Sequence, residues 1–175
     1  MHPLHDVAVP AVIDAFVPAV IEIPRGSRLK YELDKATGLL LLDRVLYSAV
    51  HYPANYGFVP RTHADDGDPL DILVLMQEPV VPLTIVRARV VGGLEMTDDK
   101  GKDDKIIAVA VDDPAYNHYD ALDQLPPHVT VELDRFFRDY KVLEGKATVV
   151  DQPYGRARAL DVVRAARAGY DALHP

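Results

Sequence analysis

The feature that most constrains this chain is a run of four aspartates within seven residues: Asp65, Asp66, Asp68 and Asp71. Neighbouring carboxylates repel one another, which destabilises a fold unless cations neutralise them. Gly67 and Pro69 favour a shaped turn, and Asp71 directly precedes the apolar segment 72–76, which is typical of a buried strand. The carboxylates are therefore expected on a rigid edge of the core. Oxygen-only clusters of this kind suit hard cations such as Mg²⁺ or Mn²⁺.

A second acidic cluster, at residues 98–105, contains three lysines and four aspartates: Asp98, Asp99, Asp103 and Asp104. We expect residues 97–104 to form a polar loop around Gly101. Both clusters flank predicted strands, so they could meet at one mouth of a small barrel. A solvated acidic turn is the alternative for either cluster alone. The EF-hand calcium loop is excluded, because Gln77 stands where its twelfth residue, counted from Asp66, should be Glu.

Composition favours one domain that folds without covalent crosslinks. The 175 residues match the size of one domain, and 49% hydrophobic residues suffice for a sizeable core. The absence of Cys excludes disulfides, zinc–thiolate sites, iron–sulfur clusters and thiol nucleophiles. A net charge of −8 argues against binding to nucleic acid or anionic membranes. No targeting signal and no apolar run of about 20 residues is present, so we expect a cytoplasmic protein.

The pattern of apolar residues predicts strands first and helices last. Residues 1–16 show little pattern and are expected to form a loosely ordered leader. Strands are predicted at 17–23, 29–33, 39–45, 72–76, 85–95 and 105–111, and a turn at 34–38 joins the second and third into a hairpin. One helix is predicted after Pro126-Pro127, with Leu133, Phe136, Phe137, Tyr140 and Leu143 along one face, and a second over 156–173. This order favours a single-domain α+β fold whose strands form a closed or nearly closed barrel.

Cationic and phenolic side chains accompany the acidic clusters. Lys30 and Arg44 lie in predicted strands, Tyr52 and Tyr56 flank a turn predicted within residues 52–58, and Tyr140-Lys141 lies on the first predicted helix. Cationic groups beside metal-binding carboxylates are expected where the ligand is a multivalent anion, because metals bridge some of its oxygens and Arg or Lys binds the rest. The combination favours phosphoryl chemistry, although each of these side chains taken singly is more often a packing or surface residue.

Other chemistries lack their sequence motifs. The chain has no phosphate-binding P-loop, no dinucleotide-binding glycine motif, no Gly-x-Ser-x-Gly nucleophile elbow and no paired histidines of a zinc site. Two alternatives remain open at this point. One is a barrel that binds nucleic acid without catalysis, which the acidity disfavours. The other is a metal-dependent phosphatase acting on organic phosphates or nucleotides.

The segment Asp66-Gly67-Asp68-Pro69-Leu70-Asp71-Ile72 resembles the signature of the family I soluble inorganic pyrophosphatases. Six further blocks fit bacterial members in order, at 21–24, 30–32, 42–44, 52–57, 96–105 and 136–141, so the resemblance covers about residues 17–150. It implies a five-stranded barrel of the oligonucleotide-binding (OB) type with flanking α-helices, as one pyrophosphatase domain over residues 1–175. It also implies hydrolysis of pyrophosphate to two phosphates by Mg²⁺-activated water, with in-line attack, no covalent enzyme intermediate and no nucleic-acid or membrane partner. A cytoplasmic homo-hexamer is the implied assembly.

The resemblance implies three groups of site residues. Asp68 matches the residue placed as general base. The implied ligands of several Mg²⁺ ions, for which Mn²⁺ or other divalent ions could substitute, are Glu22, Glu32, Asp66, Asp71, Asp98 and Asp103. The implied substrate-binding side chains are Lys30, Arg44, Tyr52, Tyr56, Lys105, Tyr140 and Lys141.

The chain also departs from the family pattern at three places. Asp99 stands where many members carry Glu, which leaves the role of its shorter side chain open. Leu83 follows Pro82 where Gly is usual. After residues 149–150 the usual Gly-Trp is missing, and the family's packing is not carried over to segment 151–156.

Overall fold

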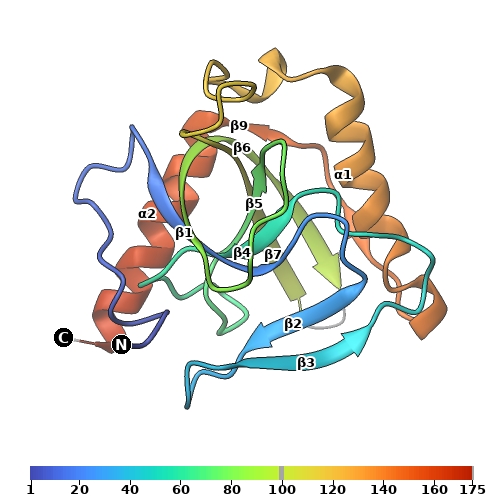
Figure 1. The fold of residues 1–175 in the computed structure, drawn as a ribbon, viewed down its shortest axis with the longest axis horizontal. Coiled ribbons are helices and arrows are strands. Elements are labelled where there is room, and N and C mark those ends of the chain that lie inside the picture. Colours follow the sequence, from blue (N-terminus) through green and yellow to red (C-terminus); the bar gives the residue numbers. More distant parts are fainter. Residues whose placement is uncertain (99–100, 175) are drawn as a thin grey trace.

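A ring of strands forms the centre of the fold in the computed structural model, which describes residues 1–98 and 101–174 (Figure 1). Within this described part, five strands pair in the order β1 (Val17–Ile23), β4 (Asn55–Phe58), β5 (Asp71–Leu75), β7 (Gly101–Ala110) and β6 (Ile85–Asp98). β6 also pairs with β1 and closes the ring. The pairing of β5 with β7 is parallel, and the other pairings in the ring are antiparallel. The predicted α+β class with an OB-type barrel is confirmed.

The remaining elements surround the ring. β2 (Leu29–Leu33) and β3 (Leu40–Val45) form a separate two-stranded sheet, the hairpin predicted from the sequence, which lies beside the barrel (Figure 1). Two helices flank the ring, α1 (Pro127–Asp139) and α2 (Arg156–Leu173), and the predicted bounds of α2 are confirmed. Short elements complete the set: 3₁₀ turns η1 (Leu122–Gln124) and η2 (Val142–Glu144), and strands β8 (Val149–Val150) and β9 (Tyr154–Gly155), which both pair with β6.

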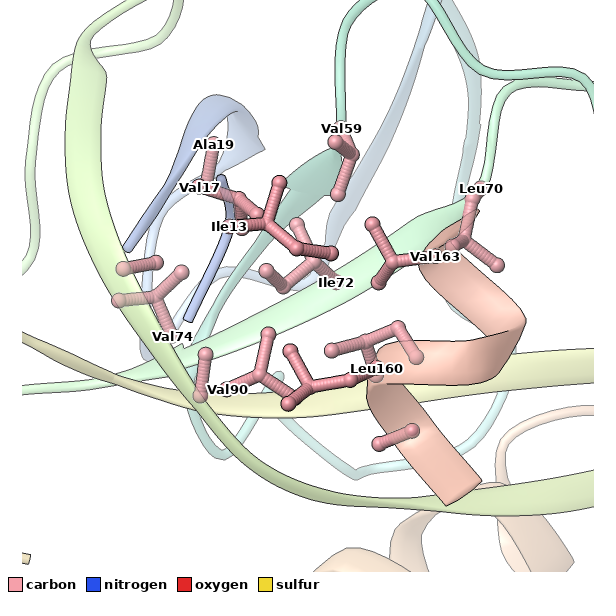
Figure 2. Close-up of a cluster of buried hydrophobic side chains, with 14 of the residues drawn as sticks. Ile13, Val17, Ala19, Val59, Leu70, Ile72, Val74, Val90, Leu160 and Val163 are labelled. Carbon is pink, nitrogen blue, oxygen red and sulfur yellow. The ribbon is translucent and has the colours of Figure 1, made fainter. Parts of the chain in front are cut away.

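Alternate residues of the ring strands belong to two different hydrophobic clusters. On β5, Ile72 and Val74 pack in one cluster together with Leu160 and Val163 of α2 (Figure 2). Leu73 and Leu75 pack in the other cluster, with the aromatic residues of α1. Because successive side chains of a strand point to opposite faces, each strand carries apolar residues on both faces. Each face of β5 therefore packs with residues of a different helix. No helix among the described residues is long and apolar enough to cross a membrane.

The prediction of a polar loop at residues 97–104 is wrong for the part of this segment that the structure describes. β6 extends to Asp98 and β7 starts at Gly101, and these two residues pair with each other. The backbone of Gly101 adopts a φ of 117°, which residues with a side chain rarely adopt, so a tight reversal is possible there. Polar side chains misled the prediction: Lys102 is exposed and Asp103 and Asp104 are half-buried, yet all three lie in β7. Asp99 lies outside the described residues.

A second correction concerns residues 52–58, which were expected to form a turn. Residues 55–58 are instead strand β4, placed between β1 and β5. Gly57 permits this placement, since a Cβ atom there would lie 1.9 Å from the carbonyl oxygen of Val20. The glycine that indicated a turn is therefore required for close approach of two strands.

α1 begins and ends where local chemistry dictates. Pro127 occupies the first helical position, where the missing N–H has no intrahelical partner in any case. The helix ends at Asp139, and Gly145 follows η2 in the left-handed region with a φ of 71°. Leu143 was predicted on the buried face of this helix, but it lies in η2 and is 66% exposed.

The N-terminal residues 1–16 contain no helix or strand, yet part of this segment is packed. The side chains of Leu4 and Ile13 are buried, and the Nδ1 atom of His5 lies 2.7 Å from the hydroxyl of Tyr170 in α2. This contact places the N-terminal segment beside the C-terminal helix (Figure 1).

The divergent segment 151–156 is anchored to the barrel by Tyr154. Its hydroxyl donates a hydrogen bond of 2.5 Å to Asp104 of β7, and the guanidinium of Arg158 lies 4.1 Å from its ring centroid. A Cβ atom at Gly93 would lie within 2.7 Å of the tyrosine ring, so the ring packs directly on the β6 backbone. Tyr154 was not singled out from the sequence.

Candidate active site

A cavity of about 190 Å³ lies where one end of the barrel meets the β2–β3 hairpin and the end of α1. Of the thirteen predicted site residues whose side chains the structure describes, twelve lie in its walls, and the exception is Arg44. The side chain of Asp98 lies outside the described part of the structure. Six carboxylates line the cavity: Glu22, Glu32, Asp66, Asp68, Asp71 and Asp103. Five ammonium groups line it as well: Lys30, Lys35, Lys102, Lys105 and Lys141.

Lys105 lies at the centre of the acidic groups. Parallel pairing of β5 with β7 sets it opposite Asp71, and its Nζ atom forms ion pairs with Asp71 and, at 2.5 Å, with Asp103. Burial disfavours the ammonium form of this 3% exposed residue, but the two carboxylates outweigh burial and raise the pKa of Lys105. Burial also raises the pKa of Asp103, to about 6, although Lys105 opposes the change. Lys105 was expected to bind substrate and here neutralises the carboxylates.

Glu22 is a nearly buried carboxylate at the end of β1. It is 7% exposed and accepts a hydrogen bond of 2.7 Å from the backbone N–H of Leu33 in β2. Burial, together with the negative charge of Asp71, raises the pKa of Glu22 to about 8. Both causes destabilise the charged form, and a cation bound nearby would relieve the repulsion.

Asp68 has a different environment on the loop between β4 and β5. Gly67 adopts a φ of 84°, and the backbone N–H of Asp68 donates a hydrogen bond of 3.0 Å to the side chain of Asp66. The carboxylate of Asp68 is half-exposed and lies 2.5 Å from the Nζ atom of Lys35. Lys35 is in the turn of the β2–β3 hairpin and was not predicted as a site residue, because only the fold brings it to Asp68.

The hairpin supplies one wall of the cavity. Lys30 of β2 forms an ion pair with Glu32 and lies 3.3 Å from Asp43. Arg44 of β3 pairs with Asp43 and, at 2.8 Å, with Glu144 of η2. The guanidinium is therefore held by carboxylates beside the cavity, and Arg44 is the described candidate that the structure does not place in its lining.

Aromatic side chains also line the cavity, namely Tyr52, Tyr56, Phe137 and Tyr140, and Phe136 packs against two of them. The rings of Tyr52 and Tyr56 have centroids 5.3 Å apart, and Phe136 lies 4.8 Å from Tyr52 and 5.3 Å from Tyr140. Burial raises the pKa values of both Tyr52 and Tyr56 well above the ordinary value of 10, so both phenols stay protonated as hydrogen-bond donors. The ammonium of Lys141 lies 5.3 Å from the ring centroid of Tyr140.

The donor set fits a hard divalent cation by its chemistry. The chain has no Cys, and the acidic lining offers carboxylate oxygens, the ligands that Mg²⁺ and Mn²⁺ prefer. Burial, with repulsion from Asp71 as a smaller cause, raises the pKa values of Glu22 and Asp103, and a bound cation would favour their charged forms. Within residues 1–98 and 101–174, however, no three acidic or histidine side chains are arranged to hold an ion.

Carboxylates that suit divalent cations, beside lysines that suit phosphate oxygens, define a class of protein: an enzyme of phosphoryl transfer. Comparisons with known proteins agree. The family model described as inorganic pyrophosphatase matches residues 19–171. "Soluble inorganic pyrophosphatase 2" of Chlamydomonas reinhardtii is 55% identical over 163 residues, covering 93% of this chain and 85% of the relative.

Solved structures give the same result. The crystal structure of inorganic pyrophosphatase from Thermus thermophilus matches with a TM-score of 0.92 and 44% identity, covering 97% of this chain and 99% of that one. The inorganic pyrophosphatase of Helicobacter pylori matches with a TM-score of 0.89 and 42% identity, covering 95% and 99%. The chain belongs to the family I soluble inorganic pyrophosphatases. It is an inorganic diphosphatase, a hydrolase of pyrophosphate, and the expected family is confirmed.

Proposed function

We propose that the chain hydrolyses pyrophosphate in a Mg²⁺-dependent reaction, by in-line attack of water and without a covalent enzyme intermediate. The observation that carries the proposal is the mixed lining of the cavity, which contains six carboxylates and five ammonium groups. Bound Mg²⁺, or Mn²⁺ in its place, would neutralise phosphate oxygens and lower the pKa of a water molecule. The residues that would hold it are Glu22, Glu32, Asp66, Asp71, Asp98 and Asp103.

Asp68 is proposed as the general base. Its half-exposed carboxylate, whose partner Lys35 is also half-exposed, can reach water in the cavity, whereas the carboxylates of Asp71 and Asp103 are less exposed and accept hydrogen bonds from the buried Lys105. A proton acceptor must be within hydrogen-bond reach of the attacking water and still be ionised. These contrasts favour Asp68 over its neighbours for accepting the proton.

The phosphate-binding side chains are proposed to act as electrostatic and hydrogen-bonding partners of the substrate. Lys30, Lys105 and Lys141 would bind phosphate oxygens as point charges. Tyr52, Tyr56 and Tyr140 would donate hydrogen bonds from protonated phenols. In this structure the guanidinium of Arg44 pairs with Glu144. Once released from that pair, it would bind the anion through two N–H groups. Charge on the departing phosphate would thereby be stabilised.

Assembly, location and domain limits are also proposed. The resemblance to bacterial members supports a cytoplasmic homo-hexamer, and size-exclusion chromatography with light scattering would measure the mass of the assembly. The family model spans residues 19–171, which supports one pyrophosphatase domain over the chain.

One assay tests the metal dependence and the substrate together. Phosphate release is measured from pyrophosphate and, in parallel, from nucleoside triphosphates and sugar phosphates, each with Mg²⁺ and with excess chelator. We expect release that requires Mg²⁺ and is confined to pyrophosphate. Full activity in chelator would overturn the metal dependence, and faster release from a nucleotide would favour the organic-phosphate alternative.

A further inference from the structure

Two separate parts of the fold each carry some of the charged lining of the active-site cavity. The β2–β3 hairpin, which is a sheet of its own, carries Lys30 and Glu32 in the lining, and Arg44 beside it. The loop between β4 and β5 carries Asp66 and Asp68. Chemistry at the cavity requires fixed distances between these two parts, so a contact that joins them is of interest.

Lys35 makes such a contact. Its Nζ atom donates a hydrogen bond of 3.0 Å to the carbonyl oxygen of Gly67 and lies 2.5 Å from Oδ1 of Asp68. The hairpin turn that bears Lys35 is itself ordered by Asp34, whose side chain accepts hydrogen bonds from the backbone of Ala36 and the hydroxyl of Thr37. One ammonium group thus joins a fixed turn to both the backbone and the side chain of the opposite loop.

The backbone of the opposite loop is held by its own hydrogen bonds, from Ala64 N–H to the carbonyl oxygen of Asp68 and from Gly67 N–H to that of Ala64. These bonds do not restrain rotation of the Asp68 side chain, whereas Lys35 does. Both partners of the ion pair are half-exposed, and exposed pairs contribute little to stability. The consequence of this contact is therefore expected in geometry and not in stability.

We propose that Lys35 is a positioning residue for pyrophosphate hydrolysis. It orients the carboxylate of Asp68 and holds the hairpin, with its phosphate-binding groups, at a fixed distance from that carboxylate. This inference rests on the proposed role of Asp68 as general base. Small displacements of reacting groups are costly, since a misplacement of about 1 Å can lower a rate about 100-fold.

The first test compares Lys35→Met with a matched control, Arg164→Met, which removes an equally exposed cation from its ion pair with Asp161 on α2. We expect Lys35→Met to lower kcat roughly 10-fold while KM for pyrophosphate changes less than about 2-fold. Lys35→Arg should restore kcat to within about 3-fold, because a guanidinium can donate to both oxygens. The control should match the wild-type enzyme. A raised KM with unchanged kcat would overturn the proposal, since Lys35 would then bind substrate directly.

The second test is a double-mutant cycle with Asp68→Asn. If Lys35 acts through Asp68, Lys35→Met should lower kcat less than about 2-fold in the Asp68→Asn protein. Additive losses would overturn the positioning role and leave Asp68 as the base. A near-wild-type rate in the Asp68→Asn protein would overturn the assignment of Asp68 as the general base. It would also overturn the proposal that Lys35 acts by positioning Asp68.

A third readout is independent of turnover. Amide hydrogen exchange of residues 34–38 and 64–68 should be faster in Lys35→Met than in Arg164→Met, with equal melting temperatures. Unchanged exchange in both segments would show that the contact does not hold the two parts together, and would overturn the proposal.

Discussion

The carboxylates of the active-site cavity differ in environment, and these differences separate their proposed roles. Asp71 and Asp103 accept hydrogen bonds from the buried Lys105, while Glu22 is nearly buried and has a raised pKa of about 8. Asp68 is half-exposed and faces Lys35. Groups in such contrasting surroundings are suited to different tasks, so a division between cation ligands and a proton acceptor is expected.

Replacement of Asp68 by asparagine tests this division. The amide keeps the size of the side chain but cannot accept a proton, so kcat should fall about 100-fold to 10,000-fold, the range of a general base. Phosphate release under saturating pyrophosphate and Mg²⁺ measures the loss. The melting temperature should stay close to that of the wild-type protein, because the side chain is half-exposed. A near-wild-type kcat in the Asp68→Asn protein would contradict the assignment of Asp68 as general base.

At the residue scale, sequence patterns predicted most of the cavity lining but not its charge balance. Twelve predicted side chains line the cavity, because the motifs that carry them lie at strand ends and turns. Lys35 and Lys102 were missed, since a lysine in a polar turn has no pattern that distinguishes a site from a surface. Arg44 was predicted to bind substrate, and in the structure it pairs with Glu144, one hundred residues away, a partner that only tertiary structure could reveal.

At the element scale, the antiparallel pairing of β1 with β4 depends on Gly57. An alanine there would place its Cβ atom 1.9 Å from a backbone oxygen and 2.8 Å from the Cα atom of Ile21, and neither can move without shifting a strand. We expect Gly57→Ala to lower the free energy of unfolding by about 3 kcal/mol or more. Urea unfolding followed by circular dichroism measures the change. A midpoint equal to that of the wild-type protein would contradict the need for a glycine.

The divergent segment before α2 offers a second test at this scale. Tyr154→Phe keeps the ring under Arg158 and removes only the hydroxyl that donates to Asp104. The loss of a hydrogen bond to a carboxylate should cost about 1.5–3 kcal/mol of unfolding free energy. Urea unfolding at neutral pH measures it, with the wild-type protein and Asp104→Ala, which removes the acceptor, compared in the same series. An effect of Tyr154→Phe that persists fully in an Asp104→Ala background would show that this hydrogen bond is not its cause.

Elements were predicted where periodicity and burial agree. The second helix, the hairpin and the strands at 17–23 and 72–76 follow apolar patterns that only one structure satisfies. The ends of β6 and β7 were missed because their polar residues, among them Lys102 and Asp103 of the cavity lining, have the composition of a loop. β4 was missed because its glycine and proline neighbours indicate a turn, although Gly57 serves close strand packing. Closure of the ring by β1 and β6 depends on pairings between distant residues, which local patterns do not encode.

At the scale of the whole molecule, the acidic cavity should couple metal binding to stability. A ligand that binds only the folded state stabilises it by about 2.7 kcal/mol at 100 times its dissociation constant, or about 5–10 °C for a chain of this size. We expect Mg²⁺ to raise the melting temperature by this amount and excess chelator to reverse it. NaCl at equal ionic strength is the control. An equal shift with NaCl would mean that screening, and not a specific site, is responsible.

The separate sheet formed by β2 and β3 has a consequence for how the enzyme loses function. A two-stranded sheet outside a closed barrel has fewer pairings than the ring and should open at a lower free energy, while the barrel stays folded. Because this hairpin carries Lys30 and Glu32, turnover should disappear at urea concentrations that leave the circular dichroism of the barrel unchanged. Activity and spectroscopy would then report on different parts of the same chain, and coincident midpoints would contradict this expectation. The enzyme's working range would be set by its least stable sheet and not by its core.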